Sequence, residues 1–140
     1  MQKEVYENTV KFLIDEVLQS YNSTVFAYGA TAAGKTYTYS QFPNQYFNRM
    51  LGTKKNLGIM PRAIEDLMKR VEIDSVNHHY NLKLSYLEIY NENIRDLLAT
   101  NSGENLPLRE DPVEGVVVSE LIEIVVSTLS DINSLLRFVS

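Results

Sequence analysis

One short pattern limits the possible folds of this chain more than any other: the segment Gly29-Ala30-Thr31-Ala32-Ala33-Gly34-Lys35-Thr36. It meets the full G-x-x-x-x-G-K-[ST] pattern of a P-loop. Such a loop directs several backbone N–H groups at one point, as a chain of phosphates requires. Gly34 lets the backbone approach a ligand closely, where a Cβ would cost approach or strain. In this pattern Lys35 reaches the β- and γ-phosphates of a nucleotide, and the hydroxyl of Thr36 binds Mg²⁺.

The segments around the loop occur in the order typical of a P-loop domain. Residues 4–21 predict a helix, because apolar side chains recur at the spacing of one helical face: Val10, Leu13, Ile14, Val17, Leu18 and Tyr21. Thr24–Tyr28 is a mostly apolar run between turn-forming residues, which predicts a buried strand. A helix is then expected to begin at Lys35. The loop pattern also arises by chance, as a glycine turn with a surface lysine, but this context favours nucleotide binding.

Hydrolysis of a nucleotide requires more than a phosphate cradle. It requires an acidic residue near the metal and a group that positions water. A strand of four apolar residues that ends in Asp would supply the acidic residue, and the sequence contains no such run. The nearest approach, Val71–Asp74, falls at the end of a predicted helix. We therefore assign no catalytic residue and expect this chain, by itself, to bind better than it catalyses.

The region after the loop begins with a long irregular stretch. Residues 41–58 have no clean period and predict a loop that contains Pro43, Gly52 and Gly58. A helix is expected to begin at Pro61, since proline is favoured at the first helical position. Its buried face is expected to consist of Ile64, Leu67, Met68 and Val71.

A strand-rich region follows. Residues 80–90 predict a long strand, but its apolar side changes at Leu87 and Ile89, which indicates a bulge or two covered faces. Residues 91–98 are expected to form a short helical turn or a strand end, and 101–103 a turn. Residues 106–110 and 116–126 predict a hairpin-like pair around Pro112–Gly115.

The last predicted element is a helix. It is expected to begin at Ser127 or Thr128, because Thr128 with Asp131 fits a capping box. Its apolar face is expected to contain Ile132, Leu135, Leu136 and Val139. This period is still running at Ser140, so we expect the chain to be a truncated piece of a longer domain.

Composition excludes several classes of function. The net charge of −5, with no block of basic residues, argues against nucleic acid as the main partner. There is no cysteine for a disulfide framework or a thiolate metal site. We expect no secretory signal and no membrane span, and therefore a soluble intracellular protein. His78 and His79 are expected to be surface residues of a polar turn rather than metal ligands.

Four segments, the first of which contains the loop, carry a family resemblance that spans nearly the whole chain. Residues 24–38, which contain the loop, closely resemble the P-loop segment of kinesins. Ser85–Leu98 resembles the kinesin strand S-Y-L-E-I-Y-N-E-x-I-x-D-L-L, Gly58–Ala63 the entry G-I-x-P-R-A, and Leu108–Val118 the hairpin that follows. The form Gly29-Ala30-Thr31, with Ala30 where many kinesins have Gln, favours the kinesin-eight branch weakly.

The resemblance implies a fold and a set of roles. The fold would be α/β, a P-loop NTPase of kinesin type, with a partial central sheet flanked by helices. Residues 29–36 would cradle the phosphates of ATP, with Thr36 on Mg²⁺, and Tyr37 matches the position whose ring stacks on adenine. A first-turn aromatic packed on the sheet is an equal alternative for Tyr37. Residues 101–118 match the hairpin region that contacts tubulin in kinesins, although a solvated loop is the simpler interpretation.

Three departures from the family are apparent. Ala32 stands where kinesins often have Gly or Ser; because Ser is accepted there, we expect ATP binding to survive. Residues 39–49 are an insert in the loop that interrupts the P-loop helix, either a surface loop or unremoved intron sequence. The 140 residues also lack both kinesin switch motifs and the main microtubule-binding helix. We thus expect 1–140 to be a partial kinesin motor domain.

Three functions are compatible with these features. The first is the ATP-binding part of a microtubule motor, whose parent would lie in the cytoplasm on the cytoskeleton and bind microtubules, with no nucleic acid or membrane partner. The second is a non-catalytic remnant that binds nucleotide or a partner without turnover. The third, an unrelated P-loop kinase, does not explain Ser85–Leu98.

Overall fold

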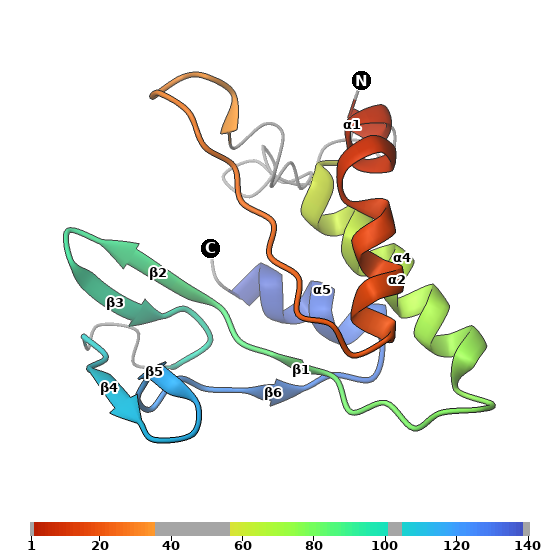
Figure 1. The fold of residues 1–140 in the computed structure, drawn as a ribbon. Coiled ribbons are helices and arrows are strands. Elements are labelled where there is room, and N and C mark those ends of the chain that lie inside the picture. The colour runs from red at the N-terminus through yellow and green to blue at the C-terminus, as the bar shows by residue number, and fades with distance from the viewer. Residues whose placement is uncertain (1, 36–56, 101–104, 139–140) are drawn as a thin grey trace. The chain divides into compact units, whose positions relative to one another are not determined.

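The computed structural model describes residues 2–35, 57–100 and 105–138, and for residues 137 and 138 the backbone alone (Figure 1). These residues form two compact units, Met1–Tyr80 and Asn81–Ser140, which are described separately below. The loop expected over 41–58, except for its last two residues, the insert 39–49 and the turn 101–103 lie outside the described residues, as does Thr36.

The first unit begins with two short helices rather than one. Helix α1 spans Gln2–Thr9 and helix α2 spans Lys11–Leu18. Val10 separates them with φ −120° and ψ −33°, outside helical values. The hydrogen bond from the Val10 N–H to the Tyr6 carbonyl (3.0 Å) is kept, so the break is local. The predicted single helix over 4–21 is therefore wrong in two ways. It is divided at Val10, and it ends earlier than predicted, before Ser20, whose φ is 68°.

Helix α4, Ile59–Asp74, forms the other half of this unit. It begins two residues before Pro61, after an extended Gly58, because proline is tolerated anywhere in the first turn, where N–H groups lack helical partners. Ile59 and Pro61 are its buried residues. The four side chains expected on the buried face, Ile64, Leu67, Met68 and Val71, are half-buried.

The helices meet around a small apolar core. Tyr6, Val10 and Ile59 are buried together, with Val25 and Ala63 packed against them. Each buried aliphatic side chain contributes about 1.5–3 kcal/mol through the hydrophobic effect. The pattern of residues 4–21 thus placed Val10 in the core correctly.

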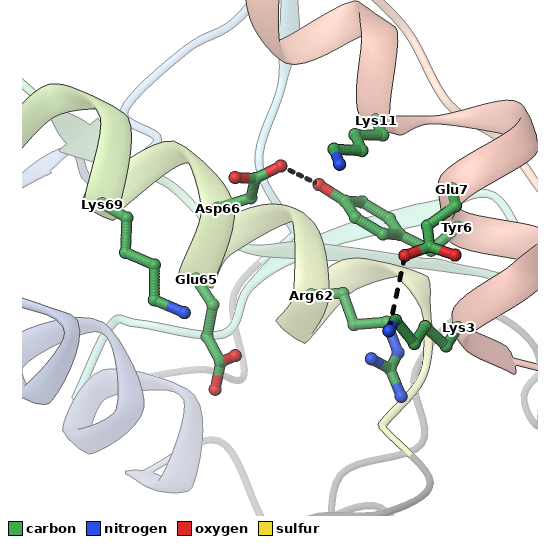
Figure 2. Close-up of a pocket in the computed structure, with 8 residues that line it drawn as sticks. All are labelled: Lys3, Tyr6, Glu7, Lys11, Arg62, Glu65, Asp66 and Lys69. Carbon is green, nitrogen blue, oxygen red and sulfur yellow. Dashed lines mark hydrogen bonds and ion pairs between the residues drawn. The ribbon is translucent and has the colours of Figure 1, made fainter.

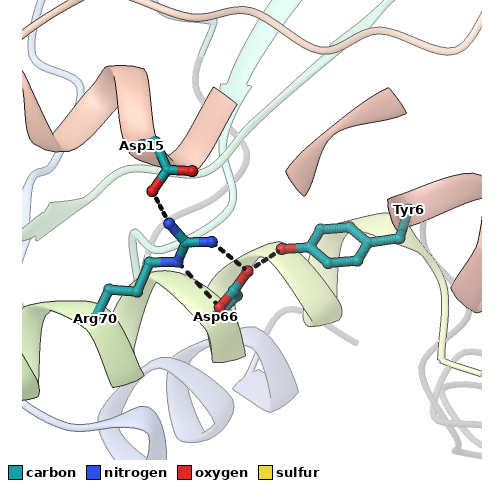
Figure 3. Close-up of polar contacts among 4 residues, drawn as sticks. All are labelled: Tyr6, Asp15, Asp66 and Arg70. Carbon is teal, nitrogen blue, oxygen red and sulfur yellow. Dashed lines mark hydrogen bonds and ion pairs between the residues drawn. The ribbon is translucent and has the colours of Figure 1, made fainter. Parts of the chain in front are cut away.

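A polar chain joins the helices beside this core (Figure 3). The Tyr6 hydroxyl donates to Asp66 Oδ2 at 2.7 Å, and Arg70 Nε donates to Asp66 Oδ1 at 3.2 Å. Arg70 also donates to Asp15 of α2. Burial, followed by the hydrogen bond to Asp66, raises the pKa of Tyr6 well above its usual range. Burial alone would raise the pKa of Asp66, but the hydrogen bonds from Tyr6 and Arg70 outweigh it and lower that pKa.

The prediction of a buried strand at Thr24–Tyr28 is wrong for the part of the chain that the structure describes. The segment is extended but pairs with no described strand. Phe26 is 81% exposed and Tyr28 is 94% exposed, while Val25 is half-buried against the helices. An extended segment buries both faces only when other strands and layers cover it, and none of the described elements does so here.

The second unit contains three two-stranded antiparallel ladders (Figure 1). Strands β1, Lys83–Leu84, and β6, Ile124–Val125, form one pair. Strands β2, Leu87–Tyr90, and β3, Asn93–Asp96, form the second, and β4, Leu108–Asp111, and β5, Gly115–Val118, the third. The predicted long strand over 80–90 is therefore two strands, with Ser85–Tyr86 unassigned between them.

Two of these ladders differ from the prediction in detail. Of the two alternatives for residues 91–98, the helical turn is wrong and a strand is present: Asn91 and Glu92, with φ 48° and 64°, make a two-residue turn that suits a β-hairpin, and β3 follows it. The hairpin around Pro112–Gly115 is confirmed, but its second strand ends at Val118. The later part of the predicted strand 116–126 supplies β6, which pairs with β1 instead.

Asp96 and the last helix stabilise this unit through backbone hydrogen bonds. Asp96 is 3% exposed, and its carboxylate accepts hydrogen bonds from the N–H groups of Leu98 (2.7 Å) and Ile122 (2.8 Å). Helix α5, Leu129–Phe138, begins with the predicted capping box: Asp131 N donates to Thr128 Oγ1 at 3.1 Å, and Asp131 Oδ2 accepts from Thr128 N at 2.8 Å. Ile132 and Leu136 are buried, as predicted.

Among the described residues, no helix combines the length and the apolar character that crossing a membrane would require.

Candidate phosphate-binding loop

The P-loop segment closes on its own lysine. The Lys35 ammonium donates to the carbonyl of Gly29 at 2.6 Å and to that of Ala30 at 2.8 Å. The N–H of Ala33 donates to the Ala30 carbonyl at 3.1 Å, which tightens the turn between them. Lys35 itself is helical, at the edge of the described residues, as expected for the residue that opens a helix. These contacts fold residues 29–35 into a loop around a single positive charge.

Three residues in this loop adopt positive φ. Gly34 has φ 87° and Ala32 has φ 65°. Gly29 has φ 157°, and a Cβ built on it would lie 3.3 Å from the Ala33 Cβ. The two glycines fit these conformations without strain. At Ala32 the Cβ is accommodated at a cost of about 1–2 kcal/mol for a left-handed alanine.

A hollow of about 220 Å³ adjoins the loop. Ala33, Gly34 and Lys35 form one side of it, and the extended segment Val25–Tyr28 together with Ile59 forms the rest. Lys35 thus lines this space together with mostly apolar residues. Such an arrangement suits a ligand whose charged end lies on the loop.

The structure brings together part of the predicted site. Gly29, Ala30, Thr31, Ala32, Ala33, Gly34 and Lys35 are described and lie in one loop, whereas Thr36 and Tyr37 lie outside the described residues. Ile59 borders the hollow and was not among the predicted site residues. Ile59 belongs to the G-I-x-P-R-A segment, whose resemblance to kinesins was noted, but that resemblance assigned Ile59 no role at the site.

The remaining candidate residues lie apart from this loop. His78 and His79 are exposed, as predicted, and His78 Nδ1 lies 2.8 Å from Asp74 Oδ2. Within the described part of the chain, no three His, Cys, Asp or Glu residues are grouped as a metal site would require.

Comparison with known sequences identifies the class of protein. The family model "Kinesin motor domain" matches residues 1–140. The kinesin heavy chain of Syncephalastrum racemosum is 38% identical over 136 residues, which cover 97% of this chain and 14% of that protein. The kinesin-like protein KIF3C of Mus musculus is 40% identical over 139 residues, covering 97% and 16%. The chain belongs to the kinesin motor domain family.

A plant relative and two solved structures agree with this assignment. The kinesin-like protein KIN-8A of Arabidopsis thaliana is 42% identical over 136 residues, covering 97% of this chain and 17% of that protein. A fast kinesin aligns with a TM-score of 0.83 at 36% identity, covering 99% of this chain and 37% of that one. A KIF14 dimer, in complex with AMP-PNP and a microtubule, aligns with a TM-score of 0.82 at 37% identity, covering 99% and 36%.

These comparisons establish the fold class but not the branch. The chain has the P-loop NTPase fold of kinesin motor domains. It spans between 14% and 17% of the length of the curated relatives named above. The identities to the kinesin heavy chain, KIF3C and KIN-8A are 38%, 40% and 42%, so the preference for the kinesin-eight branch stays a prediction.

Proposed function

We propose that residues 29–36 bind the phosphates of ATP and that the chain is the nucleotide-binding part of a kinesin motor head. The observation that carries this proposal is the position of Lys35, whose ammonium is held by the Gly29 and Ala30 carbonyls at the edge of the hollow. A bound phosphate chain would replace the two carbonyl groups as the partner of the Lys35 ammonium, and the N–H groups of the loop would donate further hydrogen bonds to the phosphates. Thr36 is assigned to Mg²⁺ and Tyr37 to the adenine ring, both on the family resemblance.

The proposed function of the longer protein is inferred from related kinesins. The KIF14 structure contains AMP-PNP and a microtubule, which supports nucleotide binding and a microtubule partner for the protein to which these residues belong. We accordingly propose that 1–140 is a partial motor domain with an insert at 39–49, and that the hairpin region 101–118 faces tubulin. The protein would act on microtubules in the cytoplasm and move along them by ATP hydrolysis.

One observation favours a second function for the isolated chain. Its sequence contains no apolar strand that ends in Asp, so the acidic residue required near the metal is not identified. A chain of this kind would bind nucleotide without turnover. Microtubule-stimulated ATPase activity of the 140-residue chain separates the two possibilities, because only a catalytic site can show it above a Lys35→Ala background.

The test of the phosphate cradle is binding of a fluorescent ATP analogue in the presence of Mg²⁺. Lys35→Ala removes the charge-assisted contact and is expected to weaken binding by roughly tenfold or more. Lys83→Ala is a matched control, because Lys83, on β1 of the other unit, pairs with Glu123 of the same unit. Equal binding by the wild-type chain and Lys35→Ala would refute the cradle, and equal loss in both variants would indicate a general charge effect.

A further inference from the structure

A second hollow lies in the first unit, between helices α1 and α2 on one side and α4 on the other. Its volume is about 210 Å³. Lys3 and Tyr6 of α1 and Lys11 of α2 line one wall, and Arg62 and Lys69 of α4 line the other. Figure 2 shows Tyr6 and Lys11 turned toward Asp66 of α4, with Arg62, Glu65 and Lys69 placed along that helix. We call this space the helix groove.

Most of the acidic groups in the helix groove are already engaged. Glu7 lies 3.6 Å from Lys3, one turn away on α1. Asp66 accepts hydrogen bonds from Tyr6 and from Arg70, which lies outside the groove lining. Glu65 is the one lining carboxylate for which the described residues provide no partner.

The basic groups are less fully engaged. Lys11 and Lys69 are exposed, and the part of the chain that the structure describes offers them no ion pair. Arg62 donates through Nε to the Leu57 carbonyl at 2.8 Å, which orients the guanidinium and leaves its two terminal nitrogens without a described partner. Three cations therefore outnumber a single free carboxylate, on a chain whose net charge is −5.

Two of these cations, Lys11 and Arg62, act on the hydrogen-bonded pair Tyr6 and Asp66. The pKa of Asp66 is lowered although burial, the largest influence, raises it; the charge of Lys11 contributes to the lowering together with Tyr6 and Arg70. The charge of Arg62 acts on Tyr6 as well, opposing the rise of its pKa that burial produces. Charged groups of α2 and α4 thus act on the hydrogen bond between Tyr6 of α1 and Asp66 of α4.

We propose that the helix groove binds a phosphate-type oxyanion through Arg62, Lys11 and Lys69. An oriented guanidinium presents a planar fork of donors that matches an oxyanion, and lysines add point charges around it. This site is distinct from the P-loop, because none of its lining residues belongs to residues 29–36.

The test is titration of the chain with inorganic phosphate at constant ionic strength, followed by NMR of the Arg62 Nε–H group. Arg62→Lys identifies that resonance by its loss. The experiment is done in the Lys35→Ala background, so that phosphate bound at the P-loop does not contribute. We expect a saturable shift, which Lys11→Gln with Lys69→Gln weakens by about fivefold or more, the scale of a lost charge-assisted contact or two.

Two further variants test whether the change in phosphate affinity follows the charge of the groove. Glu65→Gln removes the free carboxylate and is expected to tighten binding, an effect that damage to the fold would not produce. Lys83→Gln, in the other unit, is expected to leave binding unchanged. A linear, non-saturating shift, equal binding in the double lysine variant, or a shift that exists only when Lys35 is present would overturn the proposal. A glycerol phosphate titration then separates free phosphate from a phosphoryl group on a larger molecule: equal affinity indicates the latter and weaker affinity the former.

Discussion

Tyr6 and Tyr28 lie in the same unit of this chain, in opposite surroundings. Tyr6 is 6% exposed, packs with Val10 and Ile59, and donates a hydrogen bond to Asp66. Tyr28 is 94% exposed on an extended segment that leads into the P-loop. The helix junction around Tyr6 is completed by groups within the described residues, whereas the segment around Tyr28 has no described strand beside it. The difference shows that Tyr6 belongs to the packed core of the unit and Tyr28 to the exposed segment beside the candidate site, while Val25 and Ile59 belong to both.

The same substitution at both tyrosines tests this comparison with the largest expected effect. Tyr6→Ala removes a buried ring and leaves a cavity, and should lower the free energy of unfolding by about 3–5 kcal/mol. Tyr28→Ala removes an exposed ring and should change it by less than about 0.5 kcal/mol. Urea denaturation followed by far-ultraviolet circular dichroism measures both. Similar losses in the two variants would mean that Tyr28 is covered in solution and that the contrast is wrong.

Asp66 provides the next largest effect and a dependence on pH. Asp66→Asn should cost about 1–3 kcal/mol at neutral pH, because it replaces charge-assisted hydrogen bonds to Tyr6 and Arg70. The pKa of Asp66 is lower in the folded state than the ordinary value of 3.8, so its contribution is present above that value. It is lost as pH falls through the lower, folded pKa. The gap in urea stability between the wild-type chain and Asp66→Asn should therefore close in acid.

Asp15 supplies the control for this prediction. It also pairs with Arg70, but its side chain is 59% exposed, so solvent screens the pair. Asp15→Asn should cost less than about 1 kcal/mol. If Asp15→Asn destabilised the chain as much as Asp66→Asn, the buried bond to Tyr6 would not be the stabilising element of the junction.

The smallest effect concerns backbone conformation, and here the two regions should respond with opposite sign. Ala63→Gly in helix α4 should cost about 1 kcal/mol, because glycine loses more conformational freedom in a helix. Ala32→Gly in the P-loop should not destabilise the chain, since it relieves a residue with φ 65°. Binding of an ATP analogue should change little, because the strain is already present in the loop without ligand and cancels from the binding free energy. A loss of affinity in Ala32→Gly would show that the alanine rigidifies the loop usefully.

Local signals in the sequence predicted local structure well. The capping box of Thr128 and Asp131 is formed as expected, because its hydrogen bonds join residues three positions apart. The hairpin at Pro112–Gly115 is confirmed for the same reason. The β2–β3 hairpin was missed, since Asn91-Glu92 is a less obvious turn sequence than Asn-Gly, and its positive φ values depend on strand pairing.

Burial and pairing between distant segments could not be read in this way. The apolar run Thr24–Tyr28 predicted a covered strand, yet covering it requires neighbours that no local pattern specifies. The pairing of Lys83 with Val125, 42 positions apart, was likewise not foreseen. The buried Asp96, which binds the N–H of Ile122, gave no signal, because a charged residue is expected on the surface.

The sequence by itself predicted the candidate phosphate-binding loop, since its glycines and its Lys-Thr pair are required by backbone conformation and by chemistry at fixed spacing. It also determined the family and most helices, whose periodicity is local. Only the tertiary structure decided that Lys35 is held by the carbonyls of Gly29 and Ala30, that Arg62 and Lys11 share a groove, and that Tyr6 is buried while Tyr28 is exposed. These properties depend on which surfaces meet, and side chains far apart in sequence meet only after the chain has folded.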